Sequence, residues 1–320
     1  MNSLVHRFKE LRQVHRTLYT FTLLIVGSAA LLVAGIFLDP RYIGGAPAWL
    51  KPTKFALSIV LYSASMLWIL SFLQGRARLV RFAGFWIVAV MALELGIIAL
   101  QAARGVGSHF NASSPLDSTL YSIMGIAITS LWLLHLVISV FVMRQKLEGP
   151  VLALSLRLGL VLSALGIGEA FLMTSPTALQ LAGLTSGTSL TVFGAHSVGV
   201  TDGGPGLPGL GWSTQGGDLR VGHFVGIHAL QVLPLLGWLL ASAPQLLEQQ
   251  KVRLVWLGAL GYAGGMVLVT LQALRGQSIV SPDALTLSLG SGLSVLVVGA
   301  GLWIARGRGK NSRLGAVSSD

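Results

Sequence analysis

The sequence predicts an all-helical integral membrane protein whose eight transmembrane helices form two tandem, parallel four-helix repeats. Composition predicts the membrane class, because 53% of the 320 residues are hydrophobic, only 10% are charged and the mean hydropathy is +0.75. A soluble domain usually has about 25% charged residues. A sequence pattern that recurs after an offset of 171 residues predicts the repeats.

Eight apolar runs reach the length of roughly 20 residues that a helix needs to cross a bilayer. They cover residues 18–38, 55–73, 82–103, 120–143, 151–174, 221–242, 255–274 and 284–305. The first run follows a basic segment and lacks a small-residue cleavage site, so we expect a retained span rather than a signal peptide. The two repeats then comprise residues 1–146 and 147–320.

The basic residues predict the orientation of the chain. Of the 22 Lys and Arg residues, 16 fall in the terminal segments and in alternate connections, on one side of the membrane. The positive-inside rule therefore predicts cytoplasmic N- and C-termini in the cell (inner) membrane. The formal charge of +11 is then an orientation signal, and we expect the lipid bilayer as the partner and no nucleic acid.

Three landmarks recur along the chain. Residues 100–105 read LQAARG and residues 271–276 read LQALRG, and each segment is followed by a Ser-Pro pair and an aspartate, Asp117 or Asp283. Upstream, Lys51 matches Arg220 at an offset of 169 residues. Because each copy contains four spans, an even number, both copies have the same orientation and the repeat is parallel.

Arg104 and Arg275 end matching spans, and each precedes one of these aspartates. One interpretation is that each Arg–Asp pair ties an outer hairpin together. The other is that the two arginines, with Arg220 and Gln272 nearby, clamp an anionic small molecule or a lipid headgroup between the repeats.

Glu94 lies about 14 Å below the outer end of its span at ~1.5 Å per residue. Its counterpart in the second repeat is Gly265. An ionisable group at such depth costs about 2.5–3.5 kcal/mol on insertion scales, so we expect Glu94 to face the bundle interior. Gln101 lies on the same helix face. Either the two side chains line a polar path, or Glu94 is neutral and hydrogen-bonded to a neighbouring helix.

Four histidines and one carboxylate are expected near the outer face: His109, His196, His223, His228 and Glu169. Because the chain has no cysteine, a metal ion or a b-type haem would need such ligands. His223 and His228 are about 140° apart around a helix, so they do not grip one ion from the same face. Hydrogen bonding with the outer loop and proton relay are the alternatives.

The connection at residues 175–219 contains eleven glycines and does not form a continuous helix. Residues 176–184 are expected to make a short interfacial helix. Phe193, His196 and Trp212 provide groups that pack, so we expect an ordered lid over the outer ends of the second repeat.

Residues 100–111 and 203–231 resemble a family of uncharacterised bacterial multi-pass inner-membrane proteins, and the resemblance extends over most of the chain. It implies a membrane location and no activity. Two four-helix units are also similar, in architecture alone, to the haem A synthases. Those enzymes place haem-ligating histidines in paired helices of both halves and usually have outer-loop cysteines, which this sequence lacks.

Three functions remain open at this point. The first is an outer-face His and carboxylate site that binds a metal or b-type haem for redox chemistry on a lipophilic substrate. The second is a proton-coupled transporter or carrier that uses Glu94, Gln101, Arg104 and Arg275 between the repeats. The third is a non-catalytic assembly or sensory subunit, so the sequence leaves open whether the chain is an enzyme.

Overall fold

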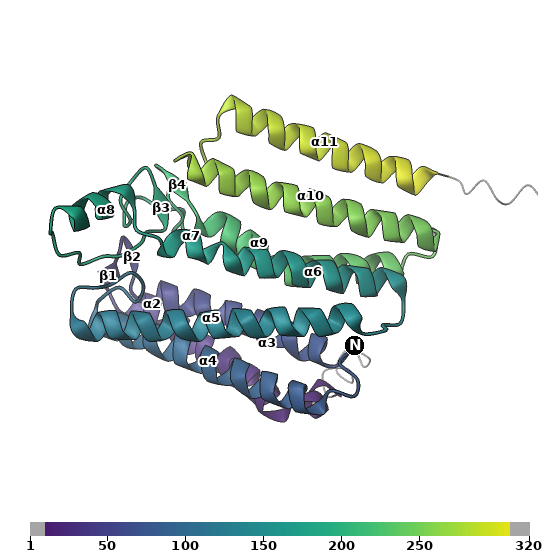
Figure 1. Cartoon of the computed structure of the whole chain (residues 1–320), viewed down its shortest axis with the longest axis horizontal. Helices are drawn as coiled ribbons and strands as arrows, with labels where there is room; N and C mark the ends of the chain where they lie inside the picture. The colour runs from purple at the N-terminus through teal and green to yellow at the C-terminus, as the bar shows by residue number, and fades with distance from the viewer. Residues whose placement is uncertain (1–9, 308–320) are drawn as a thin grey trace, which may run out of the picture.

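The computed structural model describes residues 10–307, which are helical apart from short loops and two small strand pairs (Figure 1). Within these residues, eight helices are long and apolar enough to cross a membrane. This confirms the predicted number of spans, and the chain is a multi-pass membrane protein. The long helices lie side by side, with the segment between α7 and α9 at one end of the bundle.

We describe the eight long helices as two groups of four, called units below. The N-terminal unit consists of α2 (Arg16–Leu38), α3 (Leu50–Leu70), α4 (Ala77–Arg104) and α5 (Pro115–Arg144). The C-terminal unit consists of α6 (Pro150–Gly168), α9 (Arg220–Ala241), α10 (Glu248–Leu274) and α11 (Ala284–Arg306). In both units the first helix packs on the second and third, the second on the third, and the third on the fourth. The units join through α5 with α6 and α3 with α9.

The short elements lie in two connections. A hairpin of β1 (Tyr42–Ile43) and β2 (Ala46–Pro47) precedes α3. Between α6 and α9 the chain forms α7 (Ala170–Thr174), α8 (Ala178–Thr185), β3 (Ser197–Val198) and β4 (Gly217–Asp218), and β3 pairs antiparallel with β4. Helix α8 matches the short helix expected at 176–184, and a capping box of Thr177 and Gln180 begins it.

Four helices, α3, α4, α5 and α10, begin five or more residues before their apolar runs, and one run is divided. Helix α3 begins at Leu50 rather than at residue 55, so Lys51 and Lys54 lie in its first turns. Helix α10 begins at Glu248 rather than at residue 255. The run at 151–174 is divided at Glu169 between α6 and α7. Hydropathy marks only the part of a helix in contact with hydrocarbon, whereas backbone hydrogen bonding continues through polar first turns.

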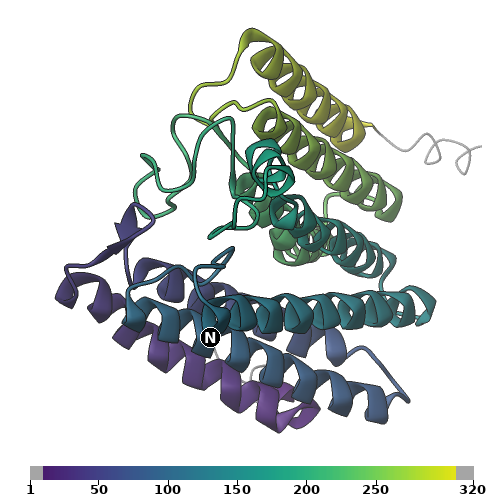
Figure 2. The ribbon, with the colours of Figure 1, turned by 60° about the vertical axis from the view of Figure 1, so that its left-hand side comes forward.

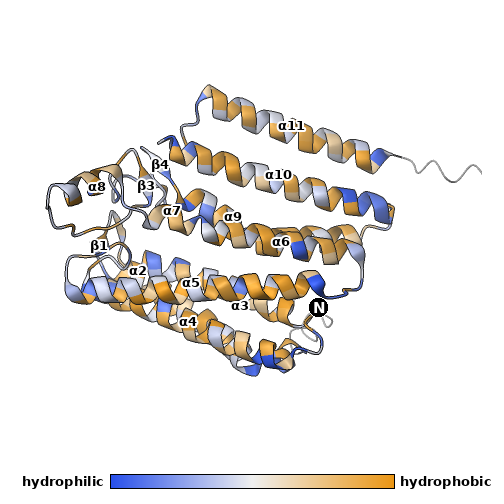
Figure 3. Cartoon of the chain, in the orientation of Figure 1, coloured by the Kyte–Doolittle hydropathy of each residue, from blue (hydrophilic) through white to orange (hydrophobic). Residues whose placement is uncertain are grey.

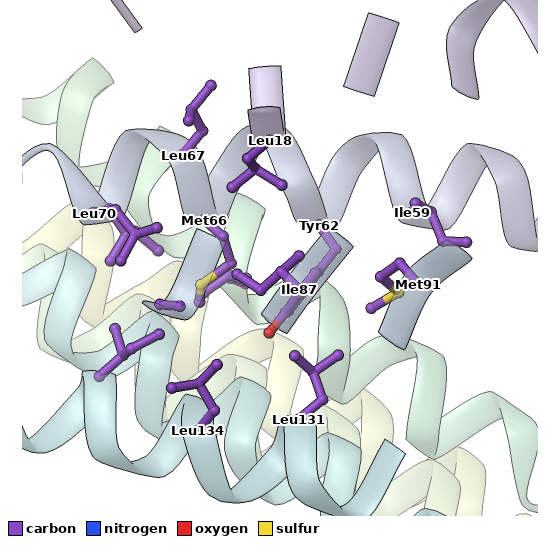
Figure 4. Close-up of a cluster of buried hydrophobic side chains, with 14 of the residues drawn as sticks. Leu18, Ile59, Tyr62, Met66, Leu67, Leu70, Ile87, Met91, Leu131 and Leu134 are labelled. Atoms are coloured by element: carbon purple, nitrogen blue, oxygen red, sulfur yellow. The ribbon is translucent and has the colours of Figure 1, made fainter. Parts of the chain in front are cut away.

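Apolar side chains cover the middle of the bundle and hydrophilic residues gather at its ends (Figure 3). Many large apolar groups are exposed, such as Phe37 at 83% and Trp303 at 72%, as expected for side chains that face lipid. Inside the N-terminal unit, Leu18, Met66 and Ile87 are completely buried in one cluster (Figure 4).

Small residues bring α6 and α9 into close contact. A Cβ atom added to Gly166 would lie 2.3 Å from the Gly226 carbonyl carbon, and one added to Gly226 would lie 2.3 Å from the Gly166 Cα. Such close backbone approach is typical of membrane helix pairs, because apolar side chains gain little by leaving lipid. The contact lies in the half of α9 that begins at the lid, and it therefore positions the first turns of α9.

Candidate functional site

Residues 175–219, called the lid below, form an ordered structure. Besides the β3–β4 pair, the backbone N–H of Leu219 donates to the carbonyl of His196 at 3.0 Å, and the Ser278 hydroxyl donates to the carbonyl of Ser213 at 2.8 Å. Gly217 lies so close to α10 that an added Cβ atom would be 1.9 Å from the Ala273 carbonyl oxygen. Here glycine permits the chain to pass directly over the end of α10.

The lid covers both units, whereas the sequence predicted cover over the second alone. The Phe193 N–H donates to the Phe110 carbonyl at 2.9 Å, and Lys54 Nζ donates to the Leu210 carbonyl at 2.6 Å. Gly203 also lies against Gly45 in the loop between β1 and β2. Figure 2 shows the lid segments crossing between the units at this end, called the lid end below. The expectation failed because hydropathy and spacing carry no information about contacts between loops.

Beneath the lid, charged and imidazole groups from both units come together. They interact electrostatically with one another, and we call them the polar cluster: Lys51, Lys54, Glu94, His109, His196, Asp202, Asp218, Arg220 and His223. Helix α3 contributes the lysines, α4 the glutamate, and α9 the arginine and one histidine. His109 comes from the α4–α5 connection, Asp218 from β4, and the other two groups from loops of the lid. The cluster therefore depends on the packing of α3 against α9.

Two histidines of the cluster have fixed tautomers. His196 Nδ1 lies 3.0 Å from an Asp202 carboxylate oxygen, and His223 Nδ1 lies 2.7 Å from the Gly166 carbonyl oxygen. Because a carboxylate and a carbonyl only accept hydrogen bonds, each Nδ1 is the donor. The Nε2 atom of each ring then has a free lone pair when the ring is neutral.

The loop groups are held in definite charge states. Burial, followed by the charges of Lys51 and the two neighbouring imidazoles, lowers the pKa of His109 well below its usual value. Burial also lowers the pKa of His196, against the opposing hydrogen bond to Asp202. Burial would raise the pKa of Asp202, but hydrogen bonds from His196 and Ser197 hold it below its usual range. At neutral pH both imidazoles are neutral and Asp202 is ionised.

Glu94 and Lys51 stand out because they lack partners. Glu94 is 3% exposed, and its Oε1 atom has no hydrogen-bond partner among the described residues. The Lys51 ammonium makes no hydrogen bond or ion pair within residues 10–307, although it interacts electrostatically with Glu94, Asp202 and Arg220. By contrast, Arg220 pairs with Asp218 at 2.6 Å.

The arginines at the ends of α4 and α10 are paired. Arg104 Nη1 lies 2.7 Å from Asp117 and also donates to Gln101, whose amide donates to the same Asp117 oxygen at 2.8 Å. Arg275 pairs with Asp283. These ion pairs are the contacts expected if each Arg–Asp pair holds an outer hairpin together. Gln272 donates to the Ser278 carbonyl at 2.7 Å, away from Arg275.

Two further predicted site residues have partners outside the cluster. Glu169 Oε1 accepts a hydrogen bond from Thr270 at 2.8 Å beside Gly222, while its Oε2 atom has no partner in the described part of the chain. His228 Nδ1 lies 3.1 Å from the Gln231 side chain, which donates to Ser65 of α3 at 2.9 Å. His109, His196 and His223 are therefore together in the cluster, and His228 and Glu169 are bound elsewhere.

The predicted metal ligands do not converge on one point. In the stretch from residue 10 to residue 307, no three His, Asp or Glu side chains form a group that could hold a metal ion. The Phe110 ring packs edge-on against His196, with 4.7 Å between ring centroids, and lies 6.3 Å from His109.

Sequence reasoning missed Lys51, Lys54 and Asp202 as site residues. A signal was present for Lys51, because it matches Arg220 in the second repeat. Both residues lie in the first turn of a helix, α3 or α9, and these helices contact each other. Asp202 has no comparable signal, because it stands in a glycine-rich stretch whose path only the folded lid defines.

Comparisons with protein-family models, with curated proteins and with solved structures return no match for this chain. The resemblance to uncharacterised membrane proteins therefore stays an expectation, and the function is argued from the polar cluster.

Proposed function

We propose that this protein is a carrier that binds the anionic group of a small or lipophilic molecule at the polar cluster and moves it across the membrane. The observation that supports this most directly is the half-buried Lys51, whose ammonium forms no hydrogen bond or ion pair within residues 10–307. An ammonium group without a bonded carboxylate is available to bind an anion through charge-assisted hydrogen bonds.

Neither carboxylate of the lid forms an ion pair with Lys51. Asp218 is ion-paired with Arg220, and Asp202 accepts hydrogen bonds from the neutral His196 ring and from two backbone N–H groups. Lys54 adds a second positive charge. The first turns of α3 and α9 both contact residues 210–211 of the lid, and helix N-termini attract negative charge. A carboxylate or a phosphate has the chemistry that this surrounding recognises.

The architecture supports transport across the membrane rather than binding at the surface alone. The cluster lies where the two units meet, and we infer that the units are copies of a duplicated ancestor, because their helices pair in the same way. In transporters built from repeats, substrate sites lie at the repeat interface and the units rock against each other. Of the residues predicted for a transporter, Gln101, Arg104 and Arg275 are engaged in the hairpins, which leaves Glu94 and adds Lys51.

We also infer that the lid faces the outside of the cell membrane and that both termini are cytoplasmic, since 16 of 22 basic residues fall on the side opposite the lid. The chain has no cysteine, so single cysteines report on sidedness. With Ser186→Cys in the lid and Gln245→Cys before α10, an impermeant maleimide should label only the first in intact cells. The reverse labelling would overturn the orientation.

Anion binding is tested with the full chain in lipid nanodiscs. Titration calorimetry with hexanoate and with inorganic phosphate should show binding that Lys51→Gln weakens by at least tenfold. Two unit charges 4 Å apart interact by about 4 kcal/mol at an effective dielectric constant near 20, so a tenfold loss is a conservative expectation. Lys146→Gln, at an exposed lysine in the α5–α6 connection, is the matched control.

A second set of nanodiscs distinguishes the source of the anion. Phosphatidic acid in the disc that competes with soluble phosphate would identify a lipid headgroup as the ligand. Binding unaffected by the lipid would identify a soluble anion. Equal affinities of the wild type and Lys51→Gln for every probe would overturn the proposal.

Metal binding is the second candidate, and the fixed tautomers of His196 and His223 favour it. Metal-bound histidines commonly donate their second ring N–H to a carboxylate or a carbonyl, as these two rings do. A metal ion held by these two rings would support redox chemistry on a lipophilic substrate. Elemental analysis and the absorption spectrum test this, and a protein with neither stoichiometric metal nor a Soret band is no metal or haem protein. A chain that binds neither anion nor metal would fit an assembly or sensory subunit.

A further inference from the structure

Glu94 has a single charged neighbour. It lies on α4, ten residues before the end of the helix at Arg104, and is 3% exposed. Among the described residues, Lys51 of α3 is the one charged group that interacts electrostatically with its carboxyl group. No hydrogen bond reaches its Oε1 atom. No ion pair joins the two groups, and an ionised Glu94 would have Lys51 as its one charged neighbour in the described part of the chain.

Lys51 is also the cation on which the proposed anion site depends. The other groups that face it are Arg220 of α9, Lys54 of its own helix, Asp202 and His196 of the lid, and His109. Of these, Asp202 is held by His196, and Arg220 is paired with Asp218. The Lys51 ammonium therefore interacts with Glu94 on the side of the bundle interior and would interact with the bound anion on the lid side.

We propose that anion binding at Lys51 is coupled to the uptake of one proton by Glu94. When the ligand engages the ammonium, an ionised Glu94 would be left buried with a second negative charge nearby. A buried charge without a partner is costly, so the carboxylate takes a proton from water and becomes neutral. The proton adds to a carboxylate oxygen, and no other bond forms or breaks.

This inference rests on the proposed anion site and specifies its coupling. A monovalent anion and a proton enter together, so the loaded cluster has the same net charge as the empty one. Transport of the anion together with the proton is then electroneutral and independent of membrane potential. Because linkage is reciprocal, a lower pH must also strengthen anion binding by the same factor that anion binding strengthens proton binding.

The experiment measures protons taken up per anion bound. The full-length protein in nanodiscs is titrated with hexanoate, which stays ionised at neutral pH, in two buffers of different ionisation enthalpy. The wild type should take up about one proton per anion, and its affinity should fall by up to about tenfold per pH unit on the alkaline side. Glu94→Gln, a neutral mimic of the protonated state, should bind hexanoate with no proton uptake and with little dependence on pH.

The control is Glu248→Gln, at a glutamate whose side chain is 62% exposed at the opposite end of the bundle. This variant should keep the proton uptake of the wild type. If Glu94→Gln does not fold, infrared difference spectra of the wild type give an independent measurement. Addition of hexanoate should produce the carbonyl band of a newly protonated carboxyl group.

The failures of the two proposals are distinguishable. A wild type that binds no anionic probe overturns the carrier itself. Anion binding by the wild type without proton uptake, or uptake that persists in Glu94→Gln, overturns only the coupling and leaves the anion site intact. The absence of a new carbonyl band in the wild type would likewise overturn the coupling.

Discussion

Replacement of Gly166 by alanine should separate α6 from α9 and disturb the polar cluster at a distance. The added Cβ atom would lie 2.3 Å from the Gly226 carbonyl carbon, whereas carbon atoms in contact are about 3.5–4.0 Å apart. The helices must therefore move apart by more than about 1 Å. Overpacking of this kind typically costs about 1–3 kcal/mol.

The same change acts on His223, because its Nδ1 atom donates to the Gly166 carbonyl at 2.7 Å. A shift of more than about 1 Å stretches this bond beyond the usual limit near 3.2 Å. Gly166→Ala should thus lower the stability of the protein and also weaken anion binding, although residue 166 itself is not a ligand.

The assay is thermal unfolding in detergent, followed by circular dichroism, together with the hexanoate titration. Gly265→Ala is the matched control, since a Cβ atom there has no atom within 4 Å. In water alanine is favoured over glycine in a helix by about 1 kcal/mol, so the control should be neutral or slightly stabilising. Equal unfolding temperatures for the two variants would refute the packing argument.

Two other predictions concern the polar cluster. Asp218→Asn leaves the Arg220 guanidinium without its buried counterion. Breaking such a pair costs about 3–5 kcal/mol, so hydrogen exchange of the backbone amides of β3 and β4 should accelerate strongly. Asp283→Asn, in the more exposed pair with Arg275, should leave lid exchange unchanged, and equal acceleration in both would contradict the prediction. The pKa of His109 is lower in the folded state than in the unfolded state, so the unfolded state binds more protons at acidic pH. The free energy of unfolding therefore decreases as the pH falls below 6.5, the pKa of an unperturbed histidine. The wild type should lose stability over that range and His109→Gln should lose less, so parallel stability curves would argue against a buried neutral His109.

The sequence predicted the spans well and the site only in part. Each of the eight apolar runs corresponds to a long helix, because the thickness of the bilayer fixes the length of an apolar segment. The first turns of α3 were missed, since their lysines lower the local hydropathy although the backbone is already helical. For that reason hydropathy places Lys51 and Lys54 before the start of the span, whereas the structure places them in the first turns of α3 at the polar cluster.

Among the candidate residues, those with a counterpart in the other repeat and those without one were informative in different ways. The matched Arg104 and Arg275 form ion pairs with Asp117 and Asp283, which the spacing of each pair had indicated. The unmatched Glu94 is buried, as its position in an apolar span suggested, but Oε1 lacks the hydrogen bond to a neighbouring helix that one interpretation expected, and Gln101 donates to Asp117. Spacing placed His228 and His223 about 140° apart on the helix. It could not say which of them joins the cluster, because the contact that holds His228 elsewhere, the hydrogen bond of Gln231 to Ser65, involves another helix.

The sequence by itself determined the membrane class, the number of spans and the depth of Glu94, because these follow from composition and from the fixed rise of a helix. Only the tertiary structure decided which polar groups meet. The lid reaches both units, α3 packs against α9, and these contacts bring Lys51 within range of both Glu94 and Arg220. Lys51 is 43 positions from Glu94 and 169 positions from Arg220, and local periodicity does not encode proximity over such separations.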